Sequence, residues 1–232
     1  MKKTLILFFA FVFNFTFAHT CENESVKCPI DGHKVNFCVT MSMTTSGSYK
    51  DFQNIGAIGS YYEELINTCS KCYFSGYISD FKEKYSKEEK TIIKNYLSKL
   101  NKSKKKNEFE QCIIAAEIKE ILKKNSKEIA FVYLNSTYFL RNDLQKKELR
   151  IILQKKVKDN LIIAIKNKEY EVESIASIEY LIAEMNRRTN NFSEAIKYYN
   201  LAINNKDKED WVEEIAKEQK ALAEKQDSNN DI

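Results

Sequence analysis

The stretch that most constrains the fold of this chain is residues 177–203, SIEYLIAEMNRRTNNFSEAIKYYNLAI. Its apolar residues recur every three or four positions on both sides of a short polar connector, which is the period of two amphipathic helices. Alanines at positions 183, 195 and 202 fall where two packed helices must approach closely. The sequence therefore predicts a tight helical hairpin in this region.

The composition extends the helical prediction to most of the chain. One proline and five glycines in 232 residues are low counts. Helices tolerate few of either, whereas sandwiches and barrels need turn residues. A capping-box pattern, Ser86-Lys87-Glu88-Glu89, predicts one helix start. Helical spacing predicts further helices over residues 86–100, 107–124, 127–141, 144–167 and 208–225.

The first eighteen residues, MKKTLILFFAFVFNFTFA, have the pattern of a signal peptide. Lys2 and Lys3 precede an apolar run that is shorter than the roughly 20 residues of a membrane span. Thr16 and Ala18 suit positions −3 and −1 of a cleavage site. We therefore expect a periplasmic or secreted protein, attached to a membrane only if this leader stays uncleaved.

The charge balance gives no support for nucleic-acid binding. The chain has 37 basic and 33 acidic side chains, a formal net charge of +4, and two of the lysines lie in the leader. A nearly neutral mature chain lacks the basic excess typical of proteins that bind phosphate backbones. We expect a protein or peptide partner and no nucleic acid.

Five of the six cysteines lie before residue 73, in two turns and their surroundings. The turns are Cys28-Pro29-Ile30-Asp31-Gly32 and Cys69-Ser70-Lys71-Cys72, and alternating apolar residues from Val35 to Met43 predict a strand after the first. This layout is typical of a zinc ribbon, in which each turn supplies two ligands. The remaining cysteine, Cys112, falls on an apolar helix face and is expected to be a buried thiol.

The predicted metal ligands are Cys28, Cys69 and Cys72, with Asp31 as a weaker oxygen ligand and zinc as the ion. His33 and Cys38 are also close enough in sequence to contribute. Disulfide pairing is the alternative, since exported cysteines commonly pair. A third hypothesis is a thiol-disulfide oxidoreductase that uses Cys69 and Cys72, although the residues after Cys72 do not have a helical pattern.

The hairpin at 177–203 resembles a tetratricopeptide repeat (TPR). Asn186, Glu179 and Asp207 depart from the pattern of that repeat, and the preceding helix pair does not match it. We therefore predict one clear TPR-like hairpin in a degenerate stack. Six residues of the hairpin match the residue types that the repeat requires at its packing positions: Ile182, Ala183, Phe192, Ala195, Tyr199 and Ala202.

The whole mature chain resembles the bacterial family of domain of unknown function 2225. The resemblance implies TPR-like helices behind a cysteine module, with metal binding at Cys28, Cys69 and Cys72. Asp31 stands where the family pattern has a cysteine. The family resemblance rests on the two cysteine turns, on Tyr180-Leu181-Ile182-Ala183-Glu184, and on Arg187-Arg188 ahead of Phe192-Ser193-Glu194-Ala195.

Together these patterns predict a mainly α protein, a TPR-like stack of helical hairpins preceded by a small zinc-ribbon-like β/loop module. The predicted divisions are a signal peptide (1–18), the cysteine module (19–81), the helical domain (82–226) and a disordered tail (227–232).

The expected function is that of an exported interaction or scaffold protein, because the sequence contains no recognisable catalytic set. With two histidines, it lacks most histidine-based arrangements. The concave face of the hairpin is the expected partner site. Its predicted binding residues are Tyr180, Glu184, Arg187 and Arg188, in which arginines beside an aromatic suit a peptide or carboxylate.

Overall fold

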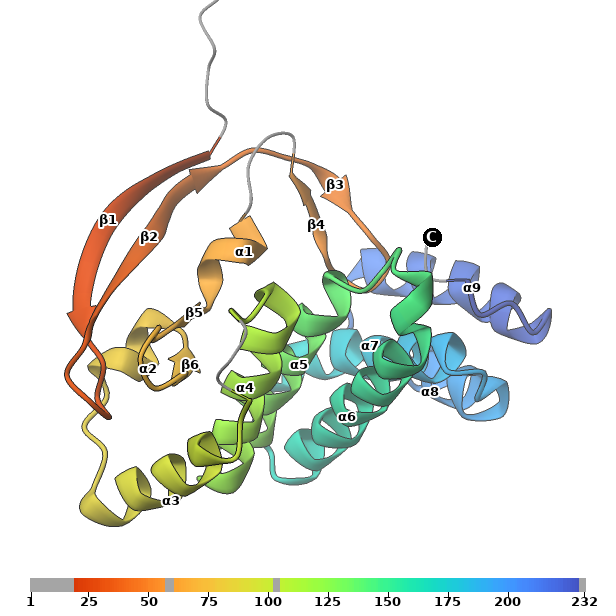
Figure 1. Cartoon of the computed structure of the whole chain (residues 1–232). Coiled ribbons are helices and arrows are strands. Elements are labelled where there is room, and N and C mark those ends of the chain that lie inside the picture. The colour runs from red at the N-terminus through yellow and green to blue at the C-terminus, as the bar shows by residue number, and fades with distance from the viewer. Residues whose placement is uncertain (1–18, 57–60, 102–104, 230–232) are drawn as a thin grey trace, which may run out of the picture.

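The computed structural model describes residues 19–56, 61–101 and 105–229 and confirms a mainly α protein (Figure 1). The predicted signal peptide lies outside the described residues. Within these residues, no helix has both the length and the apolar character needed to cross a bilayer.

The helical body is a run of helices in which each contacts the next one along the chain. The three predicted helices before residue 142 and the predicted hairpin are confirmed, while the long fourth helix begins with a 3-10 turn, Leu144–Lys146. The helices are α1 (Tyr61–Leu65), α2 (Ile78–Lys82), α3 (Lys87–Ser98), α4 (Glu108–Ile121), α5 (Ser126–Tyr138), α6 (Lys147–Lys166), α7 (Ile175–Arg188), α8 (Phe192–Asn204) and α9 (Asp210–Glu224).

Polar side chains fix where several of these helices begin. The predicted capping box at α3 is confirmed, since Ser86 Oγ accepts from Glu89 N and Glu89 accepts from Ser86 N. Asn191 precedes α8 without capping it, and its side-chain amide donates to Asn186 Oδ1 at 3.1 Å. Asn190, which follows the end of α7, has a left-handed backbone with φ of 63°.

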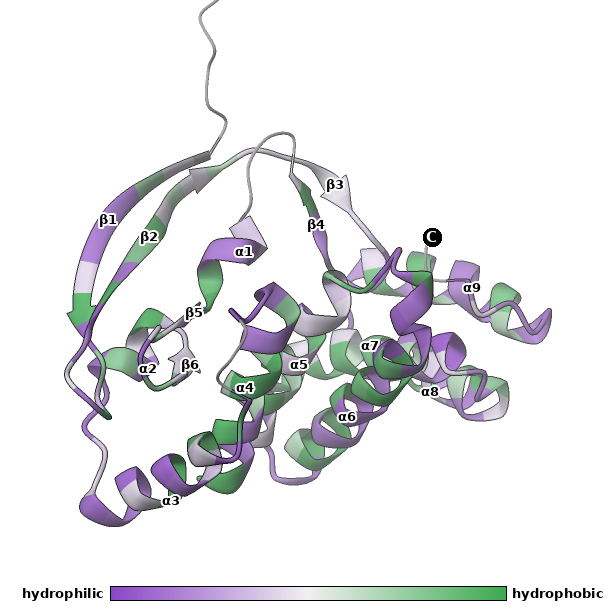
Figure 2. Ribbon diagram, viewed as in Figure 1, coloured by the Kyte–Doolittle hydropathy of each residue, from purple (hydrophilic) through white to green (hydrophobic). Residues whose placement is uncertain are grey.

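The centre of the stack is the apolar helix α5, which lies between α4 and α6. Hydrophobic residues colour α5 and α7 mainly green, whereas α3 is mostly purple (Figure 2). Ala183, Ala195 and Ala202 are fully buried where α7, α8 and α9 pack together. The tight hairpin is therefore confirmed, and its assignment to the TPR class stays a prediction.

In the residues that the structure describes, the N-terminal module consists of three two-stranded antiparallel sheets and short helices. The predicted strand after the first cysteine turn is confirmed, with Val35 and Phe37 buried, although Met41 is 66% exposed. The long β1–β2 hairpin, whose own turn is the first cysteine turn, arches over α1 (Figure 1). The strands are β1 (His19–Lys27), β2 (Lys34–Met43), β3 (Thr45–Ser48), β4 (Asn54–Gly56), β5 (Asn67–Thr68) and β6 (Ser75–Gly76).

A disulfide joins the two strands of the long hairpin. Cys21 on β1 and Cys38 on β2 are bonded, with their Cα atoms 5.2 Å apart. The sequence placed Cys38 on the strand face opposite the apolar residues, which leaves it free to reach a neighbouring strand. The disulfide therefore uses cysteines other than the predicted metal ligands Cys28, Cys69 and Cys72.

The loop between β3 and β4, residues 49–53, connects the N-terminal module to the helices. Tyr138 Oη donates to Asp51 O at 2.9 Å, and Tyr180 Oη donates to Lys50 O at 2.7 Å. Phe52, with φ of 68°, stacks near Tyr180 at a ring separation of 5.5 Å. We call residues 49–53 the docking loop.

The described part of the C-terminal tail also lies against the helices. Arg187 Nη1 donates to the carbonyls of Asp227 and Asn229, both at 3.0 Å. Residues 227–229 are thus held by α7, while the division of the chain into separate domains stays a prediction.

Candidate metal centre

The two cysteine turns have the same backbone structure. In each, the carbonyl of the first cysteine accepts from the N–H four residues later, and its N–H donates to the carbonyl five residues later. The bonds are Gly32 N to Cys28 O at 2.9 Å, Cys28 N to His33 O at 2.8 Å, Tyr73 N to Cys69 O at 2.8 Å, and Cys69 N to Phe74 O at 2.8 Å.

The match includes the residue that closes each turn. Gly32 has φ of 74° and Tyr73 has φ of 68°, so both occupy the left-handed region. Glycine adopts this region freely, whereas a tyrosine there must be held by its surroundings. Asp31 and Cys72 each follow the first cysteine of their turn by three positions, so Asp31 occupies the place of a fourth cysteine.

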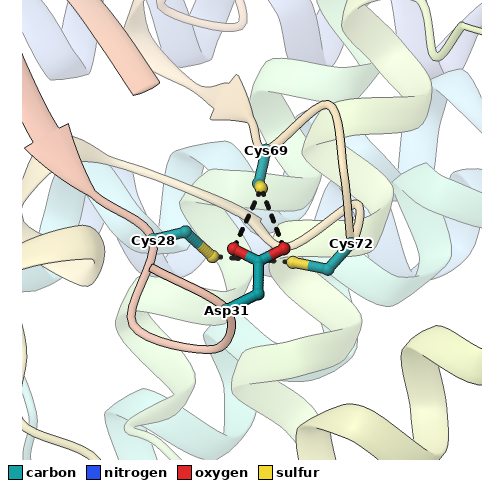
Figure 3. Close-up of side chains that lie close together, drawn as sticks. All are labelled: Cys28, Asp31, Cys69 and Cys72. Carbon is teal, nitrogen blue, oxygen red and sulfur yellow. Dashed lines mark hydrogen bonds between the residues drawn. The ribbon is translucent and has the colours of Figure 1, made fainter. Parts of the chain in front are cut away.

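The two turns bring the four predicted ligands together. One ligand atom each from Cys28, Asp31, Cys69 and Cys72 lies within 4.8 Å of all the others, and this group could hold a metal ion. Figure 3 shows the three thiols surrounding the Asp31 carboxylate. Cys28 Sγ lies 3.5 Å from Cys72 Sγ, and Cys69 Sγ lies 3.6 Å from Asp31 Oδ1.

These separations match the size of a tetrahedral site. Metal–sulfur distances of about 2.3 Å give sulfur–sulfur edges of about 3.8 Å, and a shorter metal–oxygen distance gives a slightly shorter sulfur–oxygen edge. The side chains therefore need only small rotations to surround an ion. His33, the other nearby candidate, is exposed and bonds Ser70 through Nε2, so it lies outside this group.

Hydrogen bonding among the ligands favours negative charge at Cys28 and Asp31. The bond from Cys72 lowers the pKa of the Cys28 thiol to about 7 and raises that of Cys72. Burial alone would raise the pKa of Asp31, but bonds from the His33 N–H and the surrounding thiols lower it overall. Burial raises the pKa of Cys69. Metal binding requires thiolates, and these shifts place negative charge where an ion would sit.

The cluster sits at the base of a small hydrophobic core. Cys28 and Cys69 are 3% and 0% exposed. The rings of Phe74 and Phe81 pack edge to face, with their centroids 4.9 Å apart. This core continues onto α3 and α4 through Ile93, Leu97, Ile114 and Ile118. The ligand turns are therefore fixed to the helical body as well as to each other.

The remaining cysteines are accounted for separately. Cys112 is 2% exposed on α4, as the helix-face prediction required, and burial raises its pKa to about 12. Cys21, Cys38 and Glu64 also lie close enough to form a ligand group. Because Cys21 and Cys38 are bonded to each other, their sulfurs are not thiolates in this structure.

The expectation that Tyr180, Glu184, Arg187 and Arg188 lie on an exposed binding face is wrong. Their exposed fractions are 0%, 0%, 0% and 2%. The slot pattern predicted which way these side chains point, but it could not show that other parts of the same chain cover them. Arg187 contacts the C-terminal tail, and Tyr180 and Arg188 contact the docking loop.

These residues form a buried ion network with two acids. Arg187 pairs with both oxygens of Glu184 at 3.0 Å, and Arg188 Nε donates to Glu184 Oε2 at 2.8 Å. Arg188 Nη1 and Arg141 Nη2 both donate to the Asp51 carboxylate at 2.7 Å. Burial alone would raise the pKa of Glu184, but the two neighbouring guanidinium groups lower it overall. We call this set the Asp51–Glu184 network.

A family model described as an uncharacterized protein conserved in bacteria (DUF2225) matches residues 21–223. The chain belongs to this family. No curated protein and no solved structure matches it in the corresponding comparisons. The DUF2225 match covers both cysteine turns and every described helix except the last residue of α9, as the resemblance of the motifs implied.

Two features of this DUF2225 chain had no usable sequence signal. Asp51 sits in a polar loop with nothing to mark it as buried, and Cys21 lies in a polar stretch whose strand was not predicted. The placement of Cys38 away from the apolar face of β2 was the one available sign of a cross-strand partner.

Proposed function

We propose that Cys28, Asp31, Cys69 and Cys72 bind a structural zinc ion, and that the protein acts as an exported interaction or scaffold protein. The equivalence of the two turns supports the zinc assignment, because two such turns supply four ligands in tetrahedral sites. Three thiols cannot all pair as disulfides, whereas three thiolates and a carboxylate form a complete ligand set.

The test is metal content and thiol count on protein purified from the exported fraction. We expect about one equivalent of zinc per chain. After chelation and unfolding, four free thiols should react, from the three ligands and Cys112. Absence of metal together with a Cys28–Cys72 or Cys69–Cys72 disulfide would contradict the proposal.

Asp31 offers a matched pair of variants. Asp31→Cys completes a four-thiolate set and should bind zinc at least as tightly as the wild type. Asp31→Asn removes the charge and should weaken zinc binding by about tenfold or more. His33→Ala is the control, since His33 lies beside the site but outside it. Equal zinc affinity in all three variants would exclude Asp31 as a ligand.

The oxidoreductase alternative has less support from the geometry. Reactive thiols are exposed, have lowered pKa values and commonly sit at helix N-termini. Cys69 is fully buried, the pKa of Cys72 is raised, and both lie in a turn between β5 and β6. If metal-free protein catalysed the reduction of insulin disulfides, the oxidoreductase alternative would regain support.

Export is supported by the leader sequence and by the disulfide in the β1–β2 hairpin, since such bonds persist in oxidising compartments. Cell fractionation combined with N-terminal sequencing tests it. We expect an exported chain that begins at His19. A cytosolic chain that retains its leader would contradict the proposed location.

The interaction role is supported by an aromatic groove of about 360 Å³ at the ends of α5, α7 and α9. Trp211 at its edge is 41% exposed, and exposed aromatics are enriched at protein interfaces. A photo-reactive residue at position 211 should cross-link a partner chain. Position 163, on α6 and also partly exposed, is the control, and equal cross-linking at both positions would count against this groove.

A further inference from the structure

Cys21, Cys38 and Glu64 form a second group of metal-ligating side chains, separate from the candidate metal centre. One ligand atom from each lies within 4.8 Å of the other two. Cys21 is on β1, Cys38 on β2 and Glu64 on α1, and all three are partly exposed. The disulfide between the two cysteines therefore lies beside a carboxyl group, in a place that a reductant and a metal ion can both reach from solvent.

The pairing of β1 with β2 sets the positions of the two cysteines. Cys21 pairs with Thr40, two positions beyond Cys38 on β2, so the cysteines are diagonal neighbours across the hairpin. The register shifts between Thr20 and Cys21, and such irregularities redirect side chains. Two thiolates on one ion stand about 3.8 Å apart, and Cα atoms separated by 5.2 Å allow that spacing after small side-chain rotations.

The third ligand comes from α1, which packs against β2 under the arch of the hairpin (Figure 1). Asn67 Nδ2 donates to Glu64 O at 3.4 Å and so ties the end of this short helix to β5.

A cavity of about 210 Å³ adjoins the group, and both Cys38 and Glu64 line it. Its other walls are mostly apolar, and a low dielectric strengthens the attraction between an ion and anionic ligands. The cavity has room for a water molecule beside the three protein ligands.

We propose that reduction of the Cys21–Cys38 disulfide opens a second metal site, in which both thiolates and the Glu64 carboxylate bind a thiophilic divalent cation. A dithiol reductant supplies two electrons and two protons to the disulfide and becomes a disulfide itself. The ion then displaces the two protons from the thiols. Water fills the fourth position, as in zinc sites with three protein ligands. In the oxidised chain the sulfur–sulfur bond keeps this site closed.

The test measures zinc binding to the mature chain by equilibrium dialysis, before and after reduction with dithiothreitol that is removed in the absence of oxygen. The zinc count of the oxidised chain reports the candidate metal centre, whereas the increase on reduction reports the second site, so the two sites can fail independently. We expect reduction to add about one equivalent of zinc. The double variant Cys21→Ser, Cys38→Ser should show no increase.

Glu64→Gln tests the carboxylate while leaving both cysteines in place. It should weaken the additional zinc binding about tenfold or more, and its thermal unfolding before reduction checks that it folds. Glu63→Gln is the matched control, since Glu63 is an exposed acid on the same helix outside the ligand group. The proposal is wrong if reduction adds no zinc, if the increase persists in the double cysteine variant, or if the two glutamate variants bind the additional zinc equally.

Discussion

Replacing Asp51 by asparagine tests whether the docking loop holds the two parts of the protein together. Asp51 is 2% exposed and accepts three hydrogen bonds of 2.7 Å from Arg141 and Arg188. The amide keeps the shape of the side chain but removes its charge, so two buried guanidinium groups lose their shared acid. Removing one partner of a buried ion pair costs about 3–5 kcal/mol.

For a chain of this size, each kcal/mol lowers the melting temperature by about 2–4 °C, so we expect a decrease of about 6–20 °C. Differential scanning calorimetry measures it. Asp159→Asn is the matched control, because Asp159 makes the same kind of contact with Lys158 at 3.2 Å but its side chain is 63% exposed. An exposed pair contributes about 0–1 kcal/mol.

A double-mutant cycle then isolates the pair. Asp51→Asn combined with Arg141→Gln should be less destabilised than the sum of the single variants, by at least about 1 kcal/mol. If Asp51→Asn destabilises no more than Asp159→Asn, the Asp51–Glu184 network does not stabilise the fold and the docking loop is only loosely attached.

Three further predictions concern single groups. The folded-state pKa of Glu184 is lowered. Its carboxylate therefore stabilises the fold above the unfolded pKa of about 4.3, and this stabilisation is lost as pH falls through the folded pKa. Glu184→Gln should flatten the acid limb of a curve of stability against pH. Cys112, with a pKa of about 12 and 2% exposure, should react with a thiol reagent only on unfolding, and rapid native labelling would show that α4 opens. Joint replacement of Cys21 and Cys38 by serine should cost about 3 kcal/mol if the hairpin unfolds with the rest of the protein, as measured by urea denaturation. A loss below about 0.5 kcal/mol would show that the hairpin is dispensable for the global fold.

The elements that could be predicted from the sequence are those whose signal is local. Helix periodicity and the cap at Ser86 predicted the helical stack, because both depend on residues within a few positions of each other. The grouping of Cys28, Asp31, Cys69 and Cys72 was also predictable, since each turn carries its own pattern and the ligand chemistry limits the choice.

Burial of helix residues by segments far away in the sequence could not be predicted in this way. The spacing of Tyr180 and Arg187 indicated their helix face but gave no sign that the docking loop and the tail would bury them. On α9, Ile215 packs against the core, whereas Trp211 is 41% exposed, and the buried residues are Val212, Ala216, Gln219 and Ala223. Small side chains allow the closest approach of helices, so they take the inner face while the large indole remains at the edge.

The docking loop also sets an order of events during synthesis. Asp51 and Arg188 are 137 positions apart. Closing a loop of that length costs about 4 kcal/mol of chain entropy, which local contacts of the N-terminal module do not offset. At about 5–20 residues per second, the arginine is synthesised about 7–27 seconds after the aspartate. The full set of contacts of residues 49–53 therefore forms only after α7 has been made. A chain that ends before α7 would keep the contacts of this loop with Tyr138 and Arg141 but lack those with Tyr180 and Arg188.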